Sequence, residues 1–86
     1  MTADRVERCA RLLMAAARET GMTVSGDGRV SEADAARLLA LSAGHLKNLR
    51  AAGEGPTAYN RGLAGSRVSY RLEDLAAWVE SGRDRT

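Results

Sequence analysis

The sequence has no phenylalanine, no isoleucine and a single tryptophan, so large side chains for a core are scarce. Its 44% of hydrophobic residues includes 16 alanines, against ten leucines and five valines. Leucine and valine make up 15 of 86 residues, close to the lower limit for a stably folded chain. A chain of this length excludes a two-domain enzyme and a full dinucleotide-binding fold. We therefore expect one thin-cored, alanine-rich and mostly helical domain.

Catalytic and metal-binding side chains are equally scarce. The single cysteine, Cys9, cannot form an intramolecular disulfide, and the single histidine, His45, has no cysteine or histidine near it in sequence. There is no G-x-S-x-G motif and no phosphate-binding loop. Residues 23–34 have a calcium-loop spacing but lack carboxylates at the first ligand positions, which favours a plain linker. We expect no enzymatic activity, no metal and no cofactor.

Long apolar runs are also missing. The longest, residues 12–17, is far shorter than the roughly 20 residues of a membrane span. The first 20 residues carry charges throughout, unlike a signal peptide. One cysteine fits an intracellular compartment. These observations predict a soluble, cytoplasmic protein without a membrane partner.

The net charge of +2 conceals an uneven distribution. Residues 1–44 are balanced and residues 72–86 carry a net charge of −2. Residues 45–71 carry a net charge of +4, with Glu54 as the one acid against five cations: Lys47, Arg50, Arg61, Arg67 and Arg71. Such a basic block is typical of a surface that binds a polyanion, although an ordinary solvated surface gives the same count.

The N-terminal part of the chain has helical periodicity. Residues 1–21 form an amphipathic helix that Gly21 stops, because glycine readily adopts the left-handed conformation of a helix end. Leu12 falls near the edge of the polar face. It is either an ordinary exposed leucine or a contact to another protomer. Residues 22–29 then form a glycine-containing linker.

Two short helices follow, and each begins at a serine that can cap it. Ser31 caps the first, over residues 31–41, and Ser42 caps the second, over residues 42–52. Two such helices with a short break fit a helix-turn-helix, in which the second helix enters the major groove. On that helix Asn48 suits adenine, and lysine and arginine suit guanine or phosphate. A helical hairpin with a polar outer face fits the same spacing.

The C-terminal third predicts a basic hairpin and a last helix. Residues 57–60 and 67–71 have strand-forming composition, and the glycine-containing tip between them is flanked by Arg61 and Arg67. We expect these segments to pair as a two-stranded wing. A final helix ends near residue 82, and residues 83–86 form a polar tail. Four residues of this helix are spaced to pack inward: Leu72, Leu75, Trp78 and Val79.

Residues 30–81, about 60% of the chain, resemble the small winged helix-turn-helix domains of the excisionase and MerR-like superfamily. The matching features are V-S-E-A-D-A-A-R-L-L-A-L-S, then H-L-K-N-L-R, then Gly55-Pro56 and finally V-S-Y-R-L-E-D-L-A-A-W-V. The most specific part is the pattern Y-R-x-x-D-L-x-x-W, carried by Tyr70, Arg71, Asp74, Leu75 and Trp78. The expected fold is mainly α with a small β-hairpin, a winged helix-turn-helix domain over residues 30–82 preceded by an extra N-terminal helix.

The resemblance implies a recognition helix in the major groove and a wing over the adjacent minor groove. It assigns seven residues to DNA binding: Ser42, His45, Lys47, Asn48, Arg50, Arg61 and Arg67. It assigns six to the core: Leu38, Leu46, Leu49, Tyr70, Leu75 and Trp78. The sequence departs from the family at Ala43-Gly44, where bulkier and often basic residues are usual, and in its N-terminal helix. The additional helix suggests self-association along DNA or the docking of a partner.

Small members of this superfamily resemble excisionases, also called recombination directionality factors. The resemblance implies a protein that binds repeated sites on double-stranded DNA cooperatively, bends the DNA and directs a site-specific integrase toward excision. The alternative is a transcriptional regulator of a prophage or mobile element. A terminase-small-subunit-like assembly protein is less favoured, because an oligomerisation segment is expected after the wing and the sequence ends at Thr86.

Overall fold

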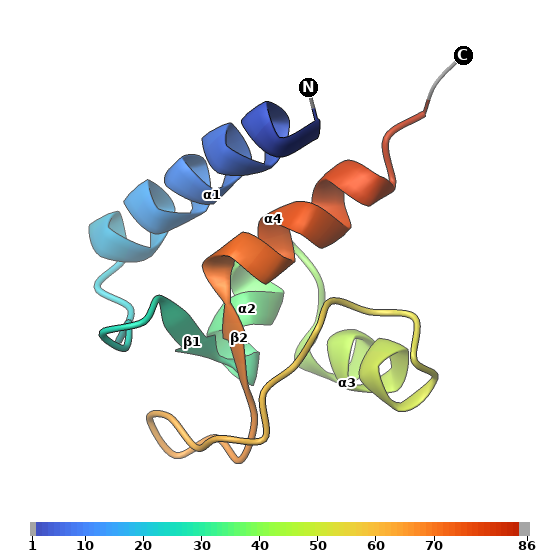
Figure 1. Ribbon diagram of the computed structural model, residues 1–86. Coiled ribbons are helices and arrows are strands. Elements are labelled where there is room, and N and C mark those ends of the chain that lie inside the picture. Colours follow the sequence, from blue (N-terminus) through green and yellow to red (C-terminus); the bar gives the residue numbers. More distant parts are fainter. Residues whose placement is uncertain (1, 85–86) are drawn as a thin grey trace.

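The computed structural model describes residues 2–84. Within them lie four helices and two short strands: α1 (Thr2–Glu19), β1 (Arg29–Ser31), α2 (Glu32–Leu38), α3 (Ala43–Ala51), β2 (Ser69–Arg71) and α4 (Leu72–Ser81). The structure is therefore mainly helical with one small antiparallel sheet (Figure 1). Of the predicted polar tail, residues 85 and 86 lie outside the described part.

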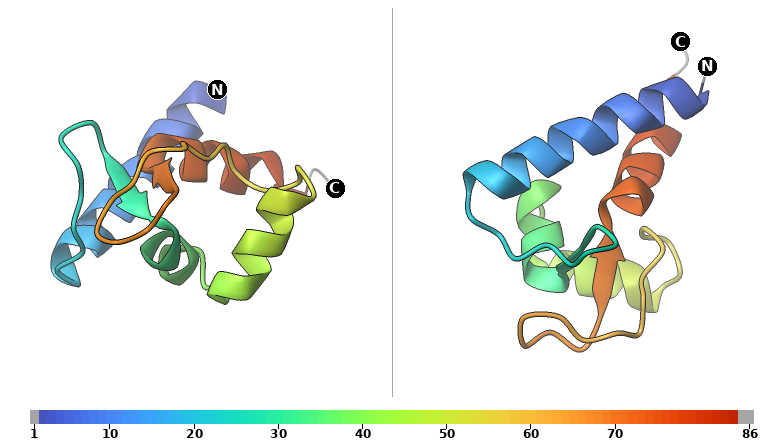
Figure 2. Two further views of the ribbon diagram at one scale, coloured as in Figure 1. Left: turned by 90° about the horizontal axis from the view of Figure 1, so that it is seen from below. Right: turned by 60° about the vertical axis from the view of Figure 1, so that its left-hand side comes forward.

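Helix α1 packs along α4, and the two run antiparallel, as both Figure 1 and Figure 2 show. Ala17 is fully buried, and Leu13 and Met14 pack against the core. The helix ends at Glu19, and Gly21 terminates it as predicted, with a φ of 70° and a hydrogen bond of 2.9 Å from the Met22 N–H to the Ala17 carbonyl. The apolar face of α1 thus belongs to the same core as the rest of the chain.

The core lies between α2, α3, α4 and the sheet. It consists of seven buried residues: Val30, Ala35, Ala36, Leu46, Tyr70, Leu72 and Leu75. The buried residues of α2 are both alanines. Their small side chains let neighbouring helices approach closely, so a packed core forms although large side chains are scarce. The predictions for Leu46, Tyr70 and Leu75 are confirmed, and Leu38 packs against the cluster from its edge.

Three residues predicted to point inward lie outside this cluster. Val79 is exposed on α4, and Leu49 and Trp78 are only half-buried. The Trp78 indole N–H donates to the Glu54 carbonyl at 3.0 Å. Leu49 packs closely against Gly55, because a Cβ added to Gly55 would lie 3.1 Å from the Leu49 Cβ. Both side chains therefore hold the loop after α3 instead of filling the core.

The turn between α2 and α3 is longer than predicted, because residues 39–41 were expected in the first of these two helices. Helix α2 ends at Leu38, because Ala40 adopts a left-handed φ of 59°. The Leu41 N–H then donates to the Ala36 carbonyl at 2.8 Å, which closes the helix end in the manner usually reserved for glycine. Both predicted caps are confirmed: Ser31 accepts the Asp34 N–H at 3.1 Å, and Ser42 begins α3 in the same way.

The predicted pairing of residues 57–60 with residues 67–71 is confirmed at one bridge only. Strand β2 forms its regular pairing with β1 instead, with Val30 opposite Tyr70. The expected partner contributes one bridge, in which Tyr59 and Ser69 exchange two backbone hydrogen bonds of 2.7 and 2.9 Å. Val30 of β1 and Tyr70 of β2 are both fully buried, so this pairing joins two core side chains across the sheet. The segment before β2 is therefore a loop with a hairpin tip.

Candidate nucleic-acid interface

Helix α3 presents its polar side chains outward because one side chain anchors it. Leu46 is fully buried, whereas His45, Lys47 and Asn48 are exposed. The Ser42 hydroxyl accepts the His45 N–H at 3.0 Å and fixes the start of the helix. There is no acidic residue in the first turn of α3, so its N-terminal N–H groups face solvent without a nearby carboxylate of their own helix.

Residues 59–68, which we call the basic loop, carry the second set of predicted side chains. Leu63 and Ser66 exchange hydrogen bonds of 3.0 and 2.9 Å around a two-residue tip. Ala64 and Gly65 both have positive φ, 51° and 84°, which is the geometry of a type I′ turn. The tip predicted between the two segments is therefore present. Arg61 and Arg67 flank it, and both are exposed.

Helix α3 and the basic loop lie at the same end of the molecule, away from α1 (Figure 1). In the view from below in Figure 2, the end of α2 that follows β1 lies between them. A hydrogen bond supports this placement: the Glu32 N–H, at the start of α2, donates to the Ser66 hydroxyl at 3.4 Å. That hydroxyl in turn donates to the Val68 carbonyl at 2.6 Å. The two predicted surfaces are thus brought together.

The basic block of residues 45–71 divides into two groups. Arg50 and Arg71 form ion pairs with carboxylates inside the molecule. Within residues 2–84 the other three form none: Lys47, Arg61 and Arg67. Those three all lie on α3 or the basic loop, so the cations of the block that form no ion pair are found at this end.

Arg50 is the member of the predicted set that the structure places differently. Its guanidinium donates two hydrogen bonds to Glu32, from Nε to Oε2 at 2.8 Å and from Nη2 to Oε1 at 3.2 Å. The Tyr70 hydroxyl donates to the same Oε2 at 2.8 Å. The Arg50 guanidinium lowers the pKa of Glu32, assisted by the tyrosine hydroxyl, although partial burial opposes this. Burial, and then the bond to Glu32, raises the pKa of Tyr70 to about 12.

Sequence reasoning missed this network. Glu32 stands in the first turn of α2, where an acid commonly complements the helix dipole, so nothing marked it as a partner for a distant residue. A usable signal did exist in the core prediction for Tyr70, because a buried tyrosine hydroxyl needs a hydrogen-bond partner.

The predicted linker contains a second charged cluster. The Asp27 carboxylate accepts hydrogen bonds from the Ser25 hydroxyl and from Arg29 Nε, and it pairs with Arg71 at 3.4 Å. The hydrogen bond from Ser25 and then that from Arg29 lower the pKa of Asp27 to about 2. The Arg71 guanidinium also lies over the Tyr59 ring, 5.2 Å from its centre. The cluster therefore fixes the start of β1 and the end of β2.

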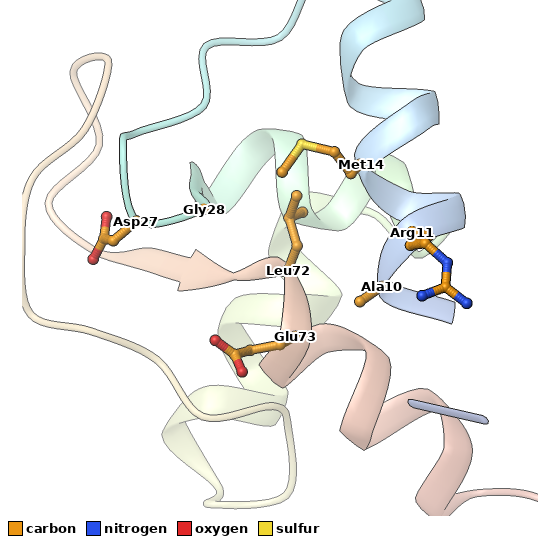
Figure 3. A pocket seen from close by; sticks show the side chains of 7 residues that line it. All are labelled: Ala10, Arg11, Met14, Asp27, Gly28, Leu72 and Glu73. Carbon is orange, nitrogen blue, oxygen red and sulfur yellow. The ribbon is translucent and has the colours of Figure 1, made fainter. Parts of the chain in front are cut away.

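A cleft of about 290 Å³ opens on another side of the molecule, between α1 and the start of α4 (Figure 3). Met14 of α1 and Leu72 of α4 line it with Ala10, and the charged groups of Arg11, Asp27 and Glu73 stand at its edges. None of the seven residues predicted to contact DNA lines this cleft. It is therefore separate from the candidate interface.

Across residues 2–84, no group of three His, Cys, Asp or Glu side chains is arranged to hold a metal ion. None of the described helices combines the length and the apolar character that a membrane crossing requires. No protein-family model, no curated protein and no solved structure matches this chain.

Proposed function

We infer that this protein binds double-stranded DNA as a winged helix-turn-helix protein, with α3 as recognition helix and the basic loop as wing. The observation that carries this proposal is a group of cations on α3 and the basic loop, two segments that contain no acidic residue. Lys47, Arg61 and Arg67 form no ion pair within residues 2–84 and share one end of the molecule with the exposed face of α3. The arginines of α1 that form no ion pair are instead interspersed with acids of the same helix. A polyanion is the partner that such a surface favours.

The dimensions of α3 suit the major groove. An α-helix with its side chains is about 10–12 Å across, which fits a groove about 12 Å wide, and the nine residues of α3 make it about 13.5 Å long. Asn48 can donate to and accept from adenine, and Lys47 can donate to guanine or to a phosphate. Ser42 and the free N–H groups of the first turn suit a phosphate oxygen, and His45 lies at the same end of the helix.

The basic loop adds contacts that carry no sequence information of their own. Arg61 and Arg67, on either side of the type I′ tip, suit phosphates or the minor groove. With Lys47 they make three cations, so the logarithm of the binding constant should fall with the logarithm of salt concentration with a slope of about −2.7. The proposed binding therefore weakens steeply with salt.

Two substitutions separate the two kinds of contact. Asn48→Ala should cost about 1–3 kcal/mol at the cognate site and little elsewhere. Arg67→Ala should weaken binding to every duplex and reduce the salt slope by about one. Arg8→Ala is the matched control, an exposed arginine on α1 at the other end of the molecule. The measurement is fluorescence anisotropy with cognate and scrambled duplexes at several salt concentrations. Equal effects of Arg67→Ala and Arg8→Ala would remove the basic loop from the interface.

The biological role we propose, on the resemblance to excisionases, is to bend DNA and direct a site-specific integrase toward excision. Footprinting on the native chromosomal neighbourhood tests it. Tandem sites beside an integrase attachment site are expected. A single palindrome over a promoter would instead assign the protein to transcriptional regulation.

Cooperative binding at tandem sites needs a contact between protomers, and α1 offers an exposed large apolar side chain for it. Leu12 is 72% exposed. Deleting α1 is a poor test, because Ala17 is buried and Leu13 and Met14 cover the core. Leu12→Ser leaves those contacts in place. It should reduce cooperativity on two adjacent sites and leave the affinity for one site unchanged; unchanged cooperativity would exclude Leu12 from the protomer contact.

A further inference from the structure

Glu32 connects three parts of the proposed interface. Its carboxylate accepts hydrogen bonds from Arg50 on α3 and from Tyr70 on β2, and its backbone N–H donates to Ser66 in the basic loop. The carboxylate thus joins α3 to β2, and the backbone N–H of the same residue joins the basic loop to the start of α2.

The pairing with Arg50 is strong enough to hold the guanidinium. Two charge-assisted hydrogen bonds from adjacent nitrogens to both carboxylate oxygens make the contact bidentate. The Glu32 side chain is 15% exposed and that of Arg50 is 33% exposed, so solvent competes weakly for the pair. Arg50 nevertheless lies one helical turn from Lys47 on α3, where a released guanidinium could reach a phosphate.

We propose that Glu32 is a specificity-determining residue that holds Arg50 off the DNA. Arg50 is accordingly a positioning residue and not a DNA ligand. This inference rests on the proposed DNA-binding function. Its physical basis is that a free arginine would add one phosphate contact, which strengthens binding to every sequence alike. Because Glu32 pairs with Arg50, discrimination between DNA sequences depends on the contacts of α3 with the bases.

Salt dependence counts the phosphate contacts and so tests the proposal. Glu32→Gln should steepen the slope of log K against log salt concentration by about 0.9 and raise the affinity for scrambled duplex. Arg50→Gln should leave the slope of the wild-type protein unchanged. The double variant should return to that slope, because the released arginine is gone. Glu7→Gln, on α1, is the control for the change in net charge alone.

Three results distinguish the outcomes. If Arg50→Gln flattens the slope by about 0.9, Arg50 contacts phosphate in the wild-type protein and the proposal is wrong. An unchanged slope in folded Glu32→Gln also overturns it. Circular dichroism establishes folding, and if Glu32→Gln does not fold, Arg50→Gln alone decides. Absence of salt-dependent binding by the wild-type protein would refute the proposed function itself, and the inference with it.

Discussion

Replacing Ala40 with glycine should stabilise this protein. Ala40 has a φ of 59° at the end of α2, where its N–H and that of Leu41 close the helix by bonding to the Arg37 and Ala36 carbonyls. An L-residue with a side chain in this conformation costs about 1–2 kcal/mol, because its Cβ crowds the following carbonyl oxygen. Glycine avoids that cost and keeps the same hydrogen bonds.

The gain is smaller than the strain, since glycine also makes the unfolded chain more flexible by about 0.4–1 kcal/mol. The net expectation for Ala40→Gly is a rise of about 0.5–1 kcal/mol in the free energy of unfolding. For a domain of this size that corresponds to a rise in Tm of roughly 2–8 °C. The substitution should leave the position of α3, and hence DNA affinity, unchanged.

Urea denaturation followed by circular dichroism measures the change. The matched control is Ala15→Gly, an exposed alanine in the interior of α1, where the same replacement should cost about 1 kcal/mol. Opposite signs for the two variants are the expected result. Destabilisation of similar size in both would refute the reasoning, because it would mean that Ala40 carries no strain worth relieving.

Three further predictions concern individual side chains. Tyr70→Phe should lower the free energy of unfolding by about 2 kcal/mol near neutral pH, because a hydrogen bond to a carboxylate is lost. Since the pKa of Tyr70 is raised from 10.0 to about 12, its contribution to stability is complete below pH 10 and is lost as pH rises toward 12. Urea titrations at several pH values should show this alkaline loss of stability in the wild-type protein and not in Tyr70→Phe. Because the pKa of Asp27 is lowered from 3.8 to about 2, its contribution to stability is present above pH 3.8 and disappears as pH falls toward 2. In acid denaturation, the stability of Asp27→Asn should therefore differ from that of the wild-type protein at pH 5 and converge with it below pH 2. Ser42→Ala removes the cap of α3 and should cost about 1 kcal/mol in urea denaturation, with faster hydrogen exchange at the His45 amide.

Local chemistry made most of the helix boundaries predictable. Ser31 and Ser42 were recognisable as caps because a serine hydroxyl satisfies an amide three residues ahead, and the structure shows both bonds. Gly21 stops α1 as expected. The end of α2 was misplaced because Ala40, which takes the left-handed conformation there, gives no such signal.

Contacts between distant segments were not predictable in the same way. The pairing of β1 with β2 joins residues about 40 positions apart, and three-residue strands are too short to show an alternating pattern. The residues of the candidate site were predicted on α3 and the basic loop, and the structure brings those two surfaces to one end. The ion pair of Arg50 was missed because its partner stands 18 residues earlier, on another helix.

The packing of α1 on α4 has a consequence for synthesis on the ribosome. Roughly 50 residues separate the end of α1 from the start of α4. At about 5–20 residues per second, α1 emerges about 3–10 s before the helix that covers it. During that interval Leu13, Met14 and Ala17 lack their native cover, and β1 likewise waits for β2. These side chains therefore become buried only after residues 69–81 have been synthesised, and the chain folds late.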